Sequence, residues 1–136
     1  MQEIELEFST EQARVDVDLV YNFLRETYWA ADRSLEQVQR TIENSRCYSV
    51  FLDRNQIAFA RVVSDYVAFA YLLDVFVLPE FRGHGIATRL LNFVLADREL
   101  SDVSVWQLKT RDAHELYRGV GFGPLEEPEL CMRLTR

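Results

Sequence analysis

The sequence of 136 residues has only two cysteines and two histidines, and these shortages exclude two classes of protein. Two cysteines, Cys47 and Cys131, are too few for a disulfide-built fold, and no His or Cys accompanies them at metal-ligand spacing. Both lie in apolar, strand-like runs, so we expect two buried, reduced thiols. No stretch of about 18 apolar residues is present and the first residues are acidic, so we expect no membrane span, no signal peptide and a cytoplasmic location.

Positive charge is also scarce. The chain has 15 Lys and Arg against 22 Asp and Glu, which gives a net charge of −7. A nucleic-acid-binding surface needs a basic patch, so this balance argues against a nucleic-acid partner. An acidic protein attracts cations, amines among them. Hydrophobic residues make up 49% of the chain, ample for one core, and we expect a single domain over residues 1–136.

One stretch in the second half combines a strand, a glycine loop and a helix. The apolar run 69–78 predicts a central strand that ends at Pro79, and apolar residues at helical spacing from Ile86 predict a helix to about Glu99. The loop between them contains Gly83 and Gly85. Such a loop directs free N–H groups and a helix N-terminus at one point, which favours phosphate binding; a turn that binds nothing is the alternative. The dinucleotide and P-loop motifs are both incomplete here.

The other elements follow from shorter signals. Alternating residues predict an edge strand at 3–9, Asp16 or Asp18 can cap a helix to about Thr27, and Ser34 to Gln37 form a capping box for a second helix. Further predictions are an antiparallel strand pair at 47–52 and 56–64 with a turn at 53–55, a strand at 103–108, a short helix from Asp112 to Arg118, and strands near Phe122 and at 130–134. Leu35, Val38 and Ile42 are expected to face inward.

Two motifs resemble one known family. Val77, Pro79, Arg82, Gly85 and Ala87 have the spacing V-x-P-x-x-R-x-x-G-x-A, which resembles the acetyl-CoA signature of the GNAT superfamily of N-acetyltransferases. The block 113–122 resembles that family's later motif, in which a helical tyrosine precedes Gly-Phe. With the flanking elements the resemblance covers nearly the whole chain. It implies an α/β fold, the GNAT-like acyl-CoA N-acyltransferase fold, with a mixed sheet flanked by about four helices.

The resemblance implies acetyl-CoA as co-substrate, an amine of a small molecule or peptide as acceptor, and direct attack in a ternary complex without a metal. The strand at 75–77 would offer its backbone to the pantetheine arm, the glycine loop would hold the pyrophosphate, and Thr110 stands where many relatives carry an asparagine that contacts CoA. The implied cofactor-binding residues are Val75, Phe76, Val77, Arg82, Gly83, His84, Gly85, Ile86, Ala87, Thr88 and Thr110.

Catalytic and acceptor residues each have two interpretations. Tyr117 matches the tyrosine that acts as general acid in similar enzymes, or is a core tyrosine. Asp74 is a candidate general base whose pKa burial would raise, or a structural aspartate. Tyr28, Trp29 and Asp32 could form the wall of an acceptor site for a cationic amine, or Trp29 could simply join the first helices to the sheet.

The function and the oligomeric state each have a second interpretation. A catalytically silent CoA-binding sensor or structural module with the same fold is the alternative to an enzyme. The exposed last strands could pair two subunits into a homodimer.

Overall fold

The structure, a computed structural model, describes residues 5–136; the start of the strand expected at 3–9 lies outside this range. Its centre is a five-stranded sheet in the order β1 (Glu7–Ser9), β2 (Arg46–Leu52), β3 (Asn55–Ser64), β4 (Phe69–Val77) and β5 (Val105–Leu108). Neighbouring strands are antiparallel except β4 and β5, which are parallel. The expected mixed α/β sheet is confirmed, with β1 and β5 at its two edges.

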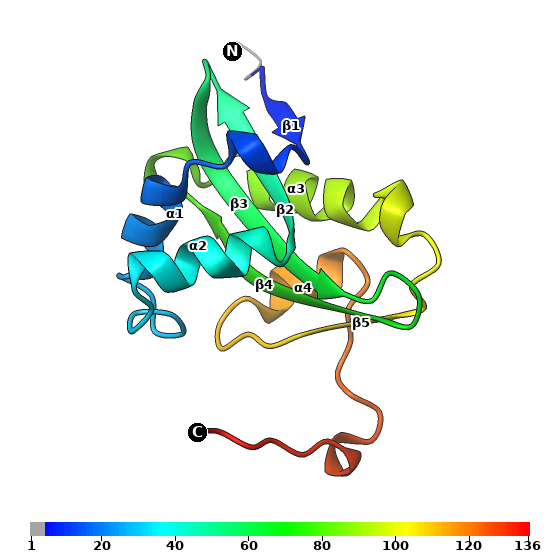
Figure 1. Ribbon diagram of the computed structural model, residues 1–136. Helices are drawn as coiled ribbons and strands as arrows, with labels where there is room; N and C mark the ends of the chain where they lie inside the picture. Colours follow the sequence, from blue (N-terminus) through cyan, green and yellow to red (C-terminus); the bar gives the residue numbers. More distant parts are fainter. Residues whose placement is uncertain (1–4) are drawn as a thin grey trace.

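Helices cover both faces of this sheet (Figure 1). The helices α1 (Val17–Leu24) and α2 (Leu35–Glu43) lie on one face, and α3 (Ile86–Leu95) and α4 (His114–Gly119) on the other. Each side has its own core. Val38 of α2 packs with Phe59 and Phe76, whereas Leu90 and Leu91 of α3 pack with apolar residues of β2, β3 and β4.

Local sequence signals set several boundaries. The Asp16 carboxylate accepts the Leu19 N–H at 3.1 Å and caps α1. Ser34 and Gln37 form the expected capping box of α2. Asp53 and Arg54 both have left-handed backbone, with φ of 49° and 70°, which matches the twist of a two-residue hairpin between β2 and β3.

Some expected boundaries are wrong. The helix after the glycine loop ends at Leu95, because Ala96 leaves helical geometry and Asp97 turns toward β2, where its carboxylate accepts hydrogen bonds from Arg46 and Tyr48. Asp112 does not cap α4. Ala113 holds the N-cap position, and its N–H donates to the hydroxyl of Thr110 at 3.1 Å.

Three expectations of burial or pairing are also wrong. Leu35, the first residue of α2, is 37% exposed, so the buried stripe of that helix starts at Val38. Cys47 is buried, as expected, but Cys131 is exposed. Strands were expected near Phe122 and at 130–134, but the chain after α4 contains only the 3₁₀ turn Pro128–Leu130, because no other described segment lies beside it to complete a strand ladder.

Candidate active site

The site forms where β4 and β5 separate. Their pairing runs only from Phe69 with Val105 to Leu72 with Leu108. Just beyond this point, β4 bulges against β3: Leu73 pairs with Arg61, but Phe76 pairs with Phe59, which leaves one residue extra on β4. Bulges increase the local twist and bend a strand. As a result, the edge of β4 facing β5 has no strand partner among the described residues from 73 to 77.

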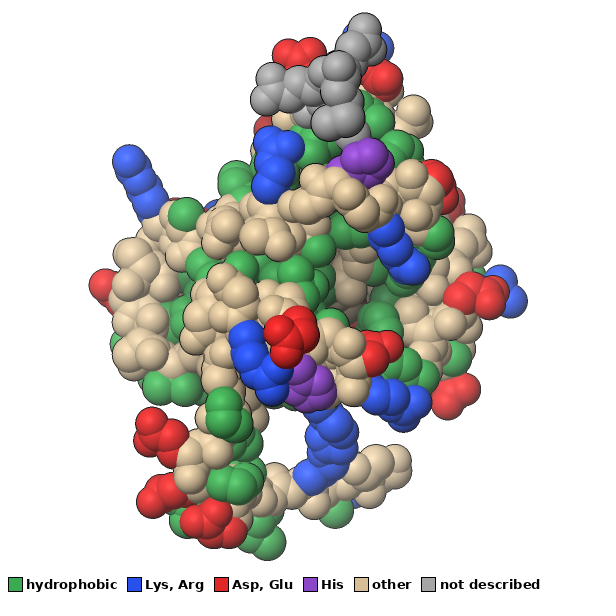
Figure 2. All heavy atoms as spheres, turned by 180° about the vertical axis from the view of Figure 1, so that it is seen from behind, with side chains coloured by type: hydrophobic (Ala, Val, Ile, Leu, Met, Phe, Trp, Pro, Cys, Tyr) green, Lys and Arg blue, Asp and Glu red, His purple; other side chains and the backbone are tan. Residues whose placement is uncertain are grey.

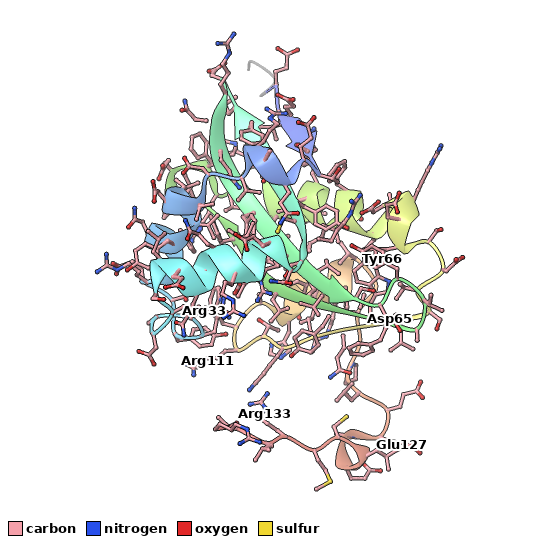
Figure 3. All side chains as sticks on the ribbon, in the orientation of Figure 1. Arg33, Asp65, Tyr66, Arg111, Glu127 and Arg133 are labelled. Atoms are coloured by element: carbon pink, nitrogen blue, oxygen red, sulfur yellow. The ribbon has the colours of Figure 1, made fainter. Side chains whose placement is uncertain are left out.

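A cavity of about 510 Å³ opens at this separation. Its walls come from β4, from the segment 109–113 after β5, from α4, and from the loop between α1 and α2. Figure 3 shows Arg33 of the α1–α2 loop and Arg111 of the β5–α4 loop at the same end of the sheet. Segments far apart in the sequence therefore meet at one cavity. The lining includes Tyr28, Trp29, Tyr71, Asp74, Val75, Thr110 and Tyr117.

Asp74 lies in the bulge with left-handed backbone, φ 53°, and its side chain is only 1% exposed. Its carboxylate accepts three hydrogen bonds: from Trp29 Nε1 at 2.9 Å, from Arg33 at 2.7 Å and from Arg61 Nε at 2.8 Å. Trp29 and Arg33 both come from the α1–α2 loop. Asp74 thus fastens this loop to the sheet. These three contacts support the interpretation of Asp74 as a structural aspartate.

The expectation that burial leaves Asp74 with a raised pKa is wrong. Burial alone does raise the pKa of this carboxyl, but the charges and hydrogen bonds of Arg61 and Arg33 outweigh it and hold the pKa below its ordinary value. A carboxylate held in this way is a weak proton acceptor. The two arginines were not singled out in the sequence, although the charge of Arg61 within an apolar strand was a usable signal.

A second contact fastens the α1–α2 loop across the cavity. The Tyr28 hydroxyl accepts the backbone N–H of Arg111 at 3.1 Å, and the Arg111 guanidinium lies 4.0 Å from the centre of the Tyr28 ring. Tyr28 and Trp29 meet edge to face at 5.1 Å. The structure therefore brings Tyr28 and Trp29 to the cavity wall, while Asp32 is exposed and does not belong to the lining.

Tyr117 projects from α4 into the cavity. Burial, with smaller effects from Tyr28 and Asp112, raises the pKa of its hydroxyl to about 12. The ring of Phe122 packs edge to face against it at 6.0 Å, so the two halves of the second motif are in contact. At neutral pH this tyrosine is a protonated hydroxyl that can donate a hydrogen bond.

The glycine loop lies at the other end of the β4 edge. Gly83 and Gly85 have φ of 84° and 73°, and Gly85 is the N-cap of α3. A Cβ at either position would meet nothing within 4 Å, so glycine is needed here for its backbone and not for space. Within residues 5–136, the N–H groups of residues 83–85 donate no hydrogen bond, and Arg82 holds the loop by donating to the Val77 carbonyl at 3.1 Å.

No helix in the range 5–136 is long and apolar enough to cross a membrane. In the same range, no three His, Cys, Asp or Glu side chains are grouped so that they could hold a metal ion.

Comparison with known proteins gives the family. Residues 43–124 match the family model described as Acetyltransferase (GNAT) domain, which is more than half of the chain. The chain belongs to the GNAT acetyltransferase family. The expected family and fold are thereby confirmed.

Individual relatives agree with this assignment. A crystal structure of a candidate GNAT-family acetyltransferase from Xanthomonas campestris pv. campestris is 43% identical, covers 97% of this chain and 94% of its own, and superposes with a TM-score of 0.93. An acetyltransferase from Clostridium acetobutylicum, solved with acetyl-CoA, is 16% identical over 96% of both chains with a TM-score of 0.71 and shares the fold.

One curated relative matches a shorter part of the chain. A candidate acetyltransferase from Gibberella zeae is 27% identical over 97 residues, covering 57% of this chain. The match spans 55% of that protein, so this chain corresponds to about half the length of the curated relative.

Proposed function

We propose that the protein is an acetyl-CoA-dependent N-acetyltransferase that transfers an acetyl group to a primary amine by direct attack in a ternary complex. The observation that carries this proposal is the unpaired edge of β4, which runs from the cavity to the glycine loop. The family and the acetyl-CoA bound to the C. acetobutylicum protein of the same fold support it. The acceptor is an amine of a small molecule or a peptide.

The residues present fit acetyl-CoA at both ends of this edge. The N–H groups of Gly83, His84 and Gly85 and the N-terminus of α3 (residues Ile86, Ala87 and Thr88) would bind the pyrophosphate, with Arg82 adding positive charge. The backbone of residues 75–77 would pair with the pantetheine amides. A backbone N–H on this edge would also polarise the thioester carbonyl, an interaction worth on the order of 3 kcal/mol in other enzymes. Thr110 already accepts one hydrogen bond but can still donate its own proton.

Tyr117 is proposed as the general acid. The bound thioester supplies the acetyl group and leaves a thiolate, which needs a proton or a hydrogen bond as it departs. Tyr117 lines the cavity, and its raised pKa of about 12 keeps the hydroxyl protonated at neutral pH. Its ring is held by Phe122, which fixes where the hydroxyl points.

The amine must lose a proton before it attacks. Two carboxylates line the cavity, Asp74 and Asp112. Asp74 is occupied by three donors and has a lowered pKa, whereas Asp112 has no ion pair with any residue in the described part of the chain. We therefore propose Asp112 as the proton acceptor, directly or through water, and Asp74 as the residue that positions the acceptor loop.

Calorimetric titration of acetyl-CoA into the wild type, Gly85→Glu and Gly85→Ala tests the binding site. Both variants place a side chain on left-handed backbone, a strain of about 1–2 kcal/mol, but only Glu adds a negative charge where the pyrophosphate would lie. We expect wild type and Gly85→Ala to bind and Gly85→Glu to fail. Release of CoA with a panel of amines then separates an enzyme from a silent CoA-binding module. A folded wild type that does not bind acetyl-CoA would refute the proposal.

A further inference from the structure

The charge around the candidate active-site cavity has the opposite sign to that of the whole chain. Three basic and two acidic residues line the cavity: Arg33, Lys109, Arg111, Asp74 and Asp112. A fourth basic residue, Arg61, forms an ion pair with Asp74 at 2.8 Å. Four positive charges therefore stand against two negative ones, in a chain whose net charge is −7.

The net charge does not set the charge that a ligand meets in this cavity. Three carboxylates, at Glu126, Glu127 and Glu129, belong to the tail 123–136, which leaves the body of the molecule (Figure 1). Figure 2 shows acidic side chains gathered on this tail. Charges more than about 8–10 Å apart are largely screened at physiological ionic strength. The residues that line the cavity therefore decide which ligand charge is favoured there.

Arg111 is held in place but has no counter-charge. Its guanidinium lies 4.0 Å from the centre of the Tyr28 ring, and its backbone N–H donates to the Tyr28 hydroxyl at 3.1 Å. Among residues 5–136 its side chain forms no ion pair, not even with its neighbour Asp112. A guanidinium that lies over an aromatic ring keeps the N–H groups in its plane available. Arg111 can therefore bind an oxyanion with a group that is already oriented.

Arg33 also has donors to spare. Its Nη1 donates to Oδ2 of Asp74 at 2.7 Å, and Arg61 Nε donates to the same oxygen at 2.8 Å. Within residues 5–136 the Arg33 side chain donates no second hydrogen bond. One carboxylate cannot neutralise two guanidinium groups. The Arg33 side chain is 25% exposed and that of Arg61 only 7%, so the surplus charge reaches the cavity at Arg33.

The two arginines come from different segments but belong to one wall. Tyr28, which lies under Arg111, meets Trp29 edge to face at 5.1 Å. Trp29 and Arg33 then bind the two oxygens of the Asp74 carboxylate. Figure 3 shows Arg33 and Arg111 at the same end of the sheet. Two guanidinium groups with free donors on one wall are suited to bind a carboxylate or phosphate group.

We propose that the acceptor is an amine that also carries an oxyanion group, a carboxylate or a phosphate, and that Arg33 and Arg111 bind this group. The inference rests on the proposed function, because it names the acceptor class of the same site. Asp112, the proposed proton acceptor, follows Arg111 in the sequence and lines the same cavity. The amine and the oxyanion of one acceptor would each meet an opposite charge. A polyamine would place its second positive charge against the arginines.

Rates of CoA release with matched amines test the acceptor class. Each set contains an amino acid, its amide and its decarboxylated amine, so that only the carboxylate changes, and the sets cover the common side chains. Phosphoethanolamine with ethanolamine gives the matched pair for phosphate, and spermidine is the polycation. We expect kcat/KM of the anionic member to exceed that of its neutral or cationic counterpart at least about tenfold, the effect of one charge-assisted hydrogen bond. The better of the two anionic arms identifies the oxyanion.

Arg111→Gln and Arg33→Gln test the two binding residues. The matched control is Arg40→Gln, which removes the same charge from an exposed position on α2 outside the cavity. We expect KM for the anionic acceptor to rise about tenfold to a hundredfold in each arginine variant, while kcat and the KM for acetyl-CoA stay near wild type. The amide of the same acceptor should show no change. Arg111 is exposed, so its variant should fold even if Arg33→Gln loosens the α1–α2 loop.

A binding measurement separates failure of this inference from failure of the proposed function. The acids, phosphoethanolamine and the amides are titrated into protein with excess CoA, which keeps ligands from the proposed pyrophosphate site, and the Nε–H NMR signals of Arg33 and Arg111 are followed. We expect an anionic amine to shift both signals and its neutral counterpart to shift neither.

Preference for neutral or polycationic amines, or arginine variants that affect acid and amide equally, would overturn the inference and leave the proposed function intact. A chain that does not bind acetyl-CoA would refute the proposed function. The same titration then decides the inference without turnover, and arginine signals that no anionic amine shifts would overturn it.

Discussion

Replacing Asp74 by Asn tests whether the ion-pair cluster holds the site together. The substitution keeps the shape of the side chain but removes its charge and one of its two acceptor oxygens. Arg61, whose side chain is 7% exposed, and Arg33, at 25%, would then lack their counter-charge. Breaking a buried ion pair by removing one partner costs about 3–5 kcal/mol. Because Arg33 remains partly solvated, we expect a loss near the lower end, about 3 kcal/mol in the free energy of unfolding.

Urea unfolding at neutral pH measures this loss, with Glu7→Gln as the matched control. Glu7 also pairs with an arginine, Arg14, but its side chain is 61% exposed, so this substitution should cause no measurable change. In a double-mutant cycle, Asp74→Asn combined with Arg61→Gln should lower the free energy of unfolding by less than the sum of the two single losses. The reason is that the double variant leaves no buried charge at position 61 without its counter-charge.

The dependence on pH gives a second check. The pKa of Asp74 is lower in the folded protein than its ordinary 3.8, so its contribution is complete above that value and is lost as the pH falls through the folded pKa. The difference between wild type and Asp74→Asn should be constant around neutral pH and shrink below about pH 4. An Asn variant as stable as Glu7→Gln, or a difference that persists in strong acid, would refute the reasoning.

Three predictions concern catalysis. Tyr117→Phe should lower kcat by about 10²–10⁴ while acetyl-CoA binding and the unfolding free energy stay near wild type; full activity would remove Tyr117 from the mechanism. Because burial raises the pKa of Tyr117 to about 12, the proton is retained below that value and kcat should not fall near the ordinary tyrosine pKa of 10.0; an alkaline loss centred there in the kcat profile would contradict this. Asp112→Asn should lower kcat without the loss of stability seen in Asp74→Asn, and an unchanged kcat would exclude Asp112 as proton acceptor.

Signals that depend on a few consecutive residues were predictable from the sequence. The capping box at Ser34, the hairpin turn at Asp53 and the glycine loop at Gly83 and Gly85 all have the expected geometry. Each is set by local backbone preference and short-range hydrogen bonds. The motif at 77–87 similarly indicated the family, because its spacing is a property of the chain alone.

The chemistry of Asp74 was decided by tertiary structure. Its partners Arg61 and Arg33 lie 13 and 41 residues away in the sequence, and only the pairing of β3 with β4 and the path of the α1–α2 loop bring them together. Burial alone predicts a raised pKa, whereas burial beside two cations lowers it.

The end of the chain also separates what the sequence predicts from what the tertiary structure decides. Alternating apolar residues at 130–134 determine that this segment is suited to a strand, and the sequence contains that information. Whether a strand forms depends on a second backbone that accepts its hydrogen bonds, and within residues 5–136 none lies beside it. The sequence by itself determined the family, the glycine loop and the alternating apolar pattern of the tail. Only the tertiary structure decided which carboxylate is paired with two arginines, which side chains share the cavity and which sheet edge stays open.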